Sequence, residues 1–134
     1  RLSLRAPAED GMSLCVVGAK TLVLATSAFT LSWTHSVQKT LWEEHWRIEQ
    51  GGLRIVEARV EGSGAGMEPG ENAKFDGRFW RWTPDLPLLP ELLLRRSDAV
   101  PKGWTLCAAG KCRAIADRAE TADVVAARPC RDGK

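Results

Sequence analysis

The strongest constraint on the fold of this chain is a series of short apolar runs that alternate with polar residues and are separated by turn residues. In "FTLSWTH", Phe29, Leu31 and Trp33 alternate with threonine and serine, which is the pattern of a half-buried β-strand. Strand-forming runs recur in "SLCVVG", "TLVLA", "LWEEHWRI", "LRIVEARV", "RFWRWTP" and "ELLLR". The sequence therefore predicts an all-β protein of about eight short strands, folded as a single-domain antiparallel β-sandwich or a partly open β-barrel.

Turn and loop residues divide the 134-residue chain into three segments. Residues 1–11 hold Pro7 and Gly11 among charged residues, and they predict a flexible leader. Residues 12–116 carry the strand pattern, and they are long enough to bury the core of one all-β domain. Residues 117–134 are rich in alanine and charged residues, so we expect a tail that is a short helix or disordered.

The charge balance and the apolar runs exclude several classes of function. The 19 basic and 17 acidic residues are interspersed and give a net charge of +2, whereas a nucleic-acid partner requires basic residues gathered on one face. No apolar run approaches the roughly 20 residues of a membrane-spanning helix. The glycine-rich "EGSGAGMEPGEN" matches neither a nucleophile elbow nor a dinucleotide fingerprint, so no cofactor is expected.

The four cysteines allow three disulfide pairings: they are Cys15, Cys107, Cys112 and Cys130. Cys107 and Cys112 lie opposite each other across a predicted hairpin at a separation that a disulfide can span, while the pairing of Cys15 with Cys130 stays open. Zinc is a weaker alternative, because there is no second pair of this kind and no histidine nearby. A disulfide favours an oxidising compartment. Because the chain begins with Arg1, we expect an exported protein whose signal peptide has been removed.

The stretch "SWTHSVQKTLWEEHW" combines both histidines of the chain with three tryptophans and two adjacent glutamates. We predict that Trp33 pairs with Glu44, and that a two-residue turn at Gly51-Gly52 then places Glu44 opposite Arg59. The ionisable groups His35, Glu44, Glu57 and Arg59 would then share one sheet face with the tryptophans Trp33, Trp42 and Trp46. Ionisable groups on an apolar face must be paired, shifted in pKa, or open to a pocket.

Several interpretations of this cluster remain open. It could be a buried Glu44–Arg59 ion pair that fixes the hairpin register. It could instead be a ligand pocket in which Arg59 binds a carboxylate and His35 donates a hydrogen bond. A small hydrolase-like enzyme using His35 with Glu44 or Glu57 is a third alternative, and a metal held by the same three residues is a fourth. Ser36 does not form a Ser–His pair with its neighbour, since adjacent strand residues point to opposite faces.

Three short motifs carry a resemblance to a known family. They are Thr34-His35-Ser36-Val37, Glu44-His45-Trp46 and Gly64-Ala65-Gly66. With the order of the surrounding strands, over roughly residues 12 to 116, they resemble a small bacterial family known as domain of unknown function 1850.

The resemblance implies a role but no reaction, because the family has no established activity. Its members often lie beside genes for TAXI-type TRAP transporters, so it implies a periplasmic accessory protein of organic-acid uptake that binds a small organic anion or docks on a transporter component. It supports a functional role for the predicted residues at its motif positions, which are His35, Ser36, Glu44, Gly64 and Gly66. The complete predicted ligand-binding set is His35, Ser36, Glu44, Glu57, Arg59, Trp33, Trp42, Trp46, Gly64 and Gly66.

Overall fold

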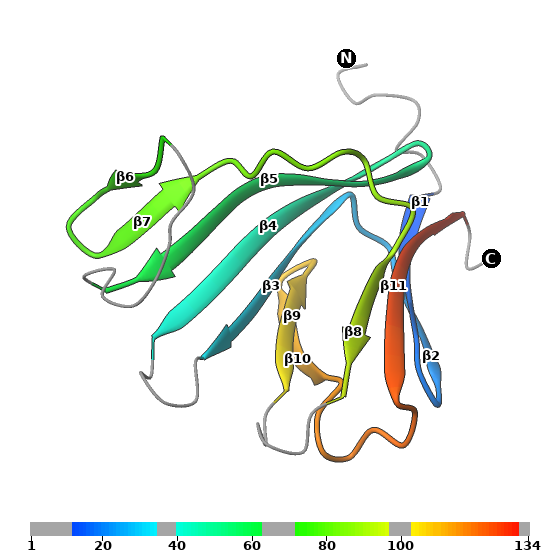
Figure 1. Cartoon of the computed structure of the whole chain (residues 1–134). Helices are drawn as coiled ribbons and strands as arrows, with labels where there is room; N and C mark the ends of the chain where they lie inside the picture. The colour runs from blue at the N-terminus through cyan, green and yellow to red at the C-terminus, as the bar shows by residue number, and fades with distance from the viewer. Residues whose placement is uncertain (1–11, 35–39, 63–71, 97–102, 132–134) are drawn as a thin grey trace.

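The fold is seen in a computed structural model, which describes residues 12–34, 40–62, 72–96 and 103–131. These residues form eleven antiparallel strands (Figure 1). In chain order they are β1 (Met12–Val17), β2 (Thr21–Leu24), β3 (Ala28–Thr34), β4 (Leu41–Glu49), β5 (Gly52–Glu61), β6 (Lys74–Phe75), β7 (Phe79–Trp82), β8 (Leu92–Arg95), β9 (Trp104–Ala108), β10 (Lys111–Ile115) and β11 (Val124–Arg131). The predicted all-β class is confirmed. None of the described segments contains a helix that is long and apolar enough to cross a membrane.

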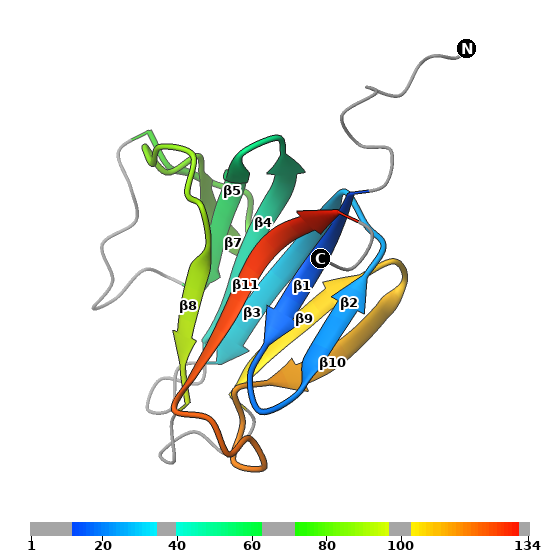
Figure 2. The same cartoon turned by 90° about the vertical axis from the view of Figure 1, so that its right-hand side faces the viewer.

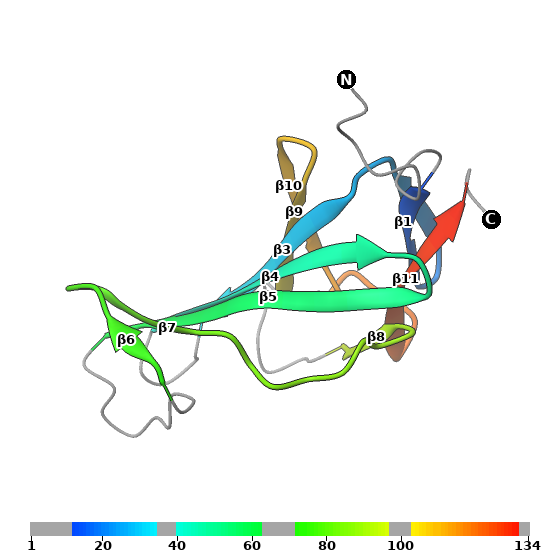
Figure 3. The ribbon, with the colours of Figure 1, turned by 90° about the horizontal axis from the view of Figure 1, so that it is seen from above.

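The strands form two sheets, and neither closes into a barrel. The small sheet has the order β2-β1-β11-β8, and the large sheet has the order β10-β9-β3-β4-β5-β7-β6. Figure 2 shows the small sheet lying in front of the large one, which confirms the sandwich rather than the barrel. Seen from above, β6 and β7 lie at the end of the large sheet that is farthest from the small sheet (Figure 3).

The main core lies between the two sheets and contains side chains from both. Leu14 and Val125 of the small sheet meet Leu31, Leu53 and Leu106 of the large sheet, and each of these side chains is at most 1% exposed. Burying one such side chain contributes about 1.5–3 kcal/mol. We call the side of the large sheet that carries Leu31, Leu53 and Leu106 its inner face, and the opposite side its outer face.

The pairing of β3 with β4 differs from the predicted register by two residues. Trp33 lies opposite Trp42 rather than Glu44, and Phe29 lies opposite Trp46. Both pairs stack almost in parallel, with interplanar angles of 11° and 8°, so this register matches aromatic side chains across the strands. Because side chains alternate with a period of two, the slip leaves Trp33, Trp42 and Glu44 on one face, as predicted.

The predicted pairing of β4 with β5 was wrong for two reasons. The turn lies at Gln50-Gly51, with Gly51 at φ +93°, and Gly52 already pairs with Glu49. A Cβ atom on Gly52 would lie 2.5 Å from the carbonyl oxygen of Leu89, so Gly52 allows the chain to pass closely there.

A β-bulge supplies the second reason. Trp46 pairs with Ile55 but His45 pairs with Glu57, so Val56 is an extra residue in β5. Beyond the bulge Glu57 and Arg59 point to the outer face, and Arg59 lies opposite Glu43 instead of Glu44.

The expectation that residues 117–134 form a tail was also wrong. Residues 124–131 form β11, which pairs with β1 along its whole length and with β8 at residues 124–127. Val125 and Ala127 are buried in the main core, so this strand is a structural part of the domain. The predicted leader, residues 1–11, lies outside the described residues.

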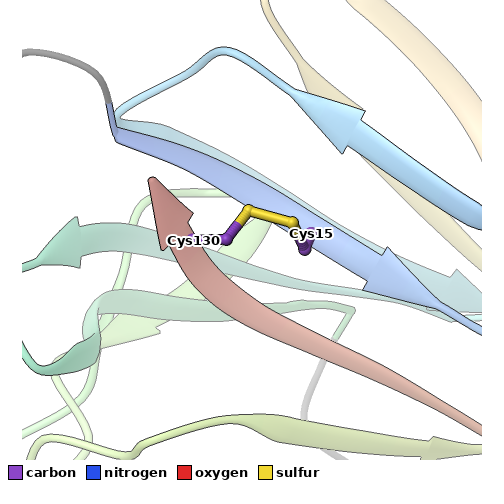
Figure 4. The surroundings of a disulfide bond; sticks show 2 residues. All are labelled: Cys15 and Cys130. Atoms are coloured by element: carbon purple, nitrogen blue, oxygen red, sulfur yellow. A yellow bond between two sulfur atoms is a disulfide. The ribbon is translucent and has the colours of Figure 1, made fainter. Parts of the chain in front are cut away.

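Two disulfides use all four cysteines. Cys107–Cys112 links β9 to β10 and is confirmed, and Cys15–Cys130 links β1 to β11 near the two ends of the described chain (Figure 4). No cysteine is left free for the zinc alternative. Two disulfides in one small domain are typical of an oxidising compartment.

Candidate functional site

The strand registers bring six tryptophans to the inner face of the large sheet. Directly paired residues in an antiparallel sheet point to the same side, and the pairs Trp33–Trp42, Trp42–Val60, Val60–Trp80 and Ala58–Trp82 carry this alignment from β3 to β7. We call the resulting surface the tryptophan face, and its members are Trp33, Trp42, Trp46, Trp80, Trp82 and Trp104.

Four of these side chains form a row across the strands. Trp104 contacts Trp33 edge-on with 4.6 Å between ring centroids, and Trp33 stacks on Trp42 at 5.6 Å. Val60, which is fully buried, separates Trp42 from Trp80 in the same row. Aromatic pairs at these separations are favourable beyond the area that they bury. The row therefore places rigid and largely apolar side chains on both sides of Val60 in β5.

Glu44 lies on this aromatic surface, between Leu31 of β3 and Ala58 of β5. The indole Nε1 of Trp46 donates a hydrogen bond to Glu44 Oε1 over 3.0 Å. Burial raises the pKa of the Glu44 carboxyl, and the Trp46 hydrogen bond opposes this rise only in part. No cation pairs with Glu44 among the described residues, so its carboxyl holds a proton at a higher pH than an exposed glutamate does.

Three buried hydrogen-bonding atoms near Val60 have no partner among the described residues. They are Trp42 Nε1, Trp80 Nε1 and Thr40 Oγ1. Trp42 and Trp80 flank Val60, and Thr40 precedes β4 on the Trp42 side. Buried donors in native proteins nearly always have an acceptor, so unpaired donors in one neighbourhood need an explanation. A bound group with acceptor oxygens is one arrangement that would satisfy them.

Comparison with known proteins places the chain in a family. A family model described as a domain of unknown function (DUF1850) matches residues 29–115. The chain belongs to this family. No curated protein and no solved structure matches the chain.

The DUF1850 match spans every member of the tryptophan face and Glu44, whereas β1, β2 and β11 lie outside it. The Cys15–Cys130 disulfide also joins strands outside the match. The candidate site therefore belongs to the part of the chain that defines the family.

Two predicted site residues, Arg59 and Glu57, lie on the outer face instead. Arg59 Nε donates to Glu43 Oε1 over 2.6 Å, and His45 Nε2 lies 3.0 Å from the same oxygen. The Arg59 guanidinium also stacks 4.5 Å from the ring centroid of Phe79. The expected Glu44–Arg59 ion pair is thus replaced by a Glu43–Arg59 pair on the opposite side of the sheet.

Glu57 lies on the outer face, as Arg59 does. Its Oε1 accepts a hydrogen bond from Arg81 over 3.0 Å, and Arg81 Nε binds Asp76 over 2.6 Å. Because Glu57 and Glu44 point to opposite faces, they cannot share a metal ion or act together on one substrate. The described residues contain no group of three His, Cys, Asp or Glu side chains that could hold a metal.

The remaining predicted residues were placed as follows. Trp33, Trp42, Trp46 and Glu44 share the tryptophan face, while His35, Ser36, Gly64 and Gly66 lie outside the described residues. Trp80, Trp82 and Trp104 were not in the predicted set. The alternation in "RFWRWTP" already put Trp80 and Trp82 in phase, and only the pairing of β7 with β5 brings them beside Trp42.

Proposed function

We propose that this protein is an exported binding module of organic-acid uptake that holds a small organic anion on the tryptophan face. Two disulfides favour export to an oxidising compartment, which we take to be the periplasm. The family resemblance motivates the link to TRAP-type transporters. The observation that carries the binding role is the pair of buried indole N–H groups without acceptors, one on each side of Val60.

The chemistry of the face suits a carboxylic acid. The indole Nε1 atoms of Trp42 and Trp80 are donors only, so each would donate to an oxygen of the ligand carboxylate. Glu44 in its protonated form would donate a third hydrogen bond, and its raised pKa makes that form available. The tryptophan rings would exclude water from these contacts, and hydrogen bonds to a charged acceptor are stronger in such surroundings.

This assignment replaces the role expected for Arg59. The guanidinium of Arg59 is engaged by Glu43 and Phe79 on the outer face, so the anion would be held by neutral donors instead of an ion pair. Sites that combine apolar walls with a few convergent polar groups are the usual form of small-ligand sites.

The test is a titration with succinate, malate, glutamate and benzoate, followed by tryptophan fluorescence and calorimetry. Trp42→Phe and Trp80→Phe each remove one indole N–H while keeping an aromatic ring, and Trp104→Phe is the matched control. We expect saturable binding of at least one acid, weakened roughly 10- to 150-fold by either of the first two changes, since one hydrogen bond to a charged group contributes about 1.5–3 kcal/mol. The proposal fails if Trp104→Phe weakens binding as much as the other two.

Docking on a transporter component through the same face is the alternative that one observation favours. Phe75 of β6 is 48% exposed and contacts Trp80 with 5.2 Å between ring centroids, so the aromatic row ends at the molecular surface. A partner protein that covers Phe75 would lose affinity in Phe75→Ser, whereas binding of a small acid at Trp42 and Trp80 would not. The same titration repeated with Phe75→Ser separates the two.

A further inference from the structure

Glu44 is the only ionisable residue of β4 that points to the inner face of the large sheet. Its neighbours Glu43 and His45 point to the outer face, because side chains alternate along a strand. Glu44 Oε1 is occupied by the hydrogen bond from Trp46 Nε1. Its second oxygen, Oε2, has no hydrogen-bond partner among the described residues and is not enclosed by protein atoms. Oε2 is therefore the atom of Glu44 that can meet a ligand on the tryptophan face.

The side chains packed around Glu44 carry no charge. Leu31 of β3 and Ala58 of β5 lie directly beside it, and Trp82 of β7 lies beyond Ala58. Asp85, on the segment that connects β7 to β8, is exposed. The residues that the small sheet contributes to the core are also apolar, and they include Leu14, Val16, Leu92, Leu94, Val125 and Ala127.

The charged residues at the two ends of β8 have other partners. Glu91, which precedes β8, lies 3.8 Å from Arg128, and Arg96, which follows it, lies 3.9 Å from Asp123. Within the described ranges no cation therefore compensates a negative charge on Glu44, and burial raises the pKa of its carboxyl. An anion bound beside Oε2 would meet a second negative charge unless Glu44 carries a proton.

We propose that the tryptophan face binds its organic anion together with one proton, which Glu44 holds between Oε2 and the ligand carboxylate. This inference rests on the proposed function and adds the regulation of the same site. A protonated Oε2 donates to the carboxylate, whereas an ionised Glu44 offers only acceptors and repels the anion. The affinity therefore falls as the pH rises. A site built on arginine, which stays charged, would keep its anion over the same range.

The test measures the Kd of benzoate and of glutamate by tryptophan fluorescence between about pH 6 and pH 8, where both ligands keep a constant charge. We expect the affinity of the wild type to fall at least about five-fold over this range and at most about ten-fold per pH unit, the limit for one proton. Glu44→Gln cannot titrate, so its affinity should not change with pH. Glu57→Gln, on the outer face, is the matched control and should keep the slope of the wild type.

Calorimetry counts the proton directly, when the same titration is made in phosphate and in Tris, two buffers with different enthalpies of ionisation. The wild type should take up as much as about one proton per anion bound, and Glu44→Gln should take up none. A wild-type affinity that does not change with pH, or a slope that Glu44→Gln retains, would overturn the coupling and leave the binding role intact. Absence of binding by every acid of the panel, even at about pH 6, would reject the binding role and the coupling together.

Discussion

The two disulfides should contribute very different amounts to stability, because they close loops of very different length. Cys15 and Cys130 are 115 positions apart in sequence, whereas Cys107 and Cys112 are 5 apart. In the chain-entropy model, removing the longer cross-link costs about 4.8 kcal/mol at 25 °C and removing the shorter one costs about 2.1 kcal/mol. A single domain has only about 5–15 kcal/mol in total, so loss of the first should leave a marginal fold.

The variants for this test are the two double substitutions to alanine. Cys15 and Cys130 are 4% and 7% exposed, so alanine is preferred to serine, which would bury a hydroxyl. Urea denaturation of each double variant and of the wild type gives the free energy of unfolding by linear extrapolation. We expect the Cys15/Cys130 variant to lose roughly 2–3 kcal/mol more than the Cys107/Cys112 variant. Equal losses, or a larger loss for the hairpin disulfide, would refute the argument from loop length.

Three further changes have expected outcomes. In the wild type, the stability contributed by the protonated Glu44 carboxyl is fully present below pH 4.5, the ordinary glutamate pKa, and is lost as the pH rises through the raised pKa of the folded protein. Glu44→Gln has no such titration. Melting curves from pH 4 to 8 should therefore show the melting temperature of the wild type falling relative to that of the variant. Arg59→Met should cost about 1 kcal/mol in urea denaturation and leave acid binding unchanged, whereas reduced affinity would restore the role first expected for Arg59. Gly52→Ala should cost more than about 2 kcal/mol in urea denaturation, because its Cβ would lie 2.5 Å from the carbonyl oxygen of Leu89, and a loss below about 1 kcal/mol would contradict this.

Alternation in the sequence was sufficient to predict which side chains of β3 and β4 share a face. Phe29, Leu31 and Trp33 do lie with Trp42 and Glu44, because a register error of two residues changes partners and not faces. The hairpin around Cys107 could also be predicted, since turn spacing and cysteine spacing agree on it.

The orientation of β5 beyond its first half could not be obtained by extending one alternation. Its buried apolar side chains are those of Leu53 and Ile55, and then Ala58 and Val60, so the phase changes from odd to even at the bulge. That change is visible in "LRIVEARV", where Leu53 and Ile55 are followed by Ala58 and Val60. A strict period of two instead put Glu57 and Arg59 on the wrong face.

The last strand, β11, was missed for a different reason. Its sequence "VVAARPCR" combines small side chains with Pro129, and this composition is atypical of an inner strand. In the fold, β8 pairs only with residues 124–127, so Pro129 has β1 as its single neighbour and needs no donor on the other side. Which strands flank a given residue is decided by long-range pairing, which composition does not show.

The most direct test of the central claim, that the tryptophan face is a ligand site, is an NMR titration of the indole N–H groups. Six tryptophans give six side-chain signals in a ¹⁵N-correlated spectrum, and single Trp→Phe variants assign them. If an organic acid is held as proposed, the Trp42 and Trp80 signals should shift downfield together and saturably, while the Trp104 signal stays in place. Shifts confined to other tryptophans, or none during a binding event that calorimetry detects, would contradict the proposal.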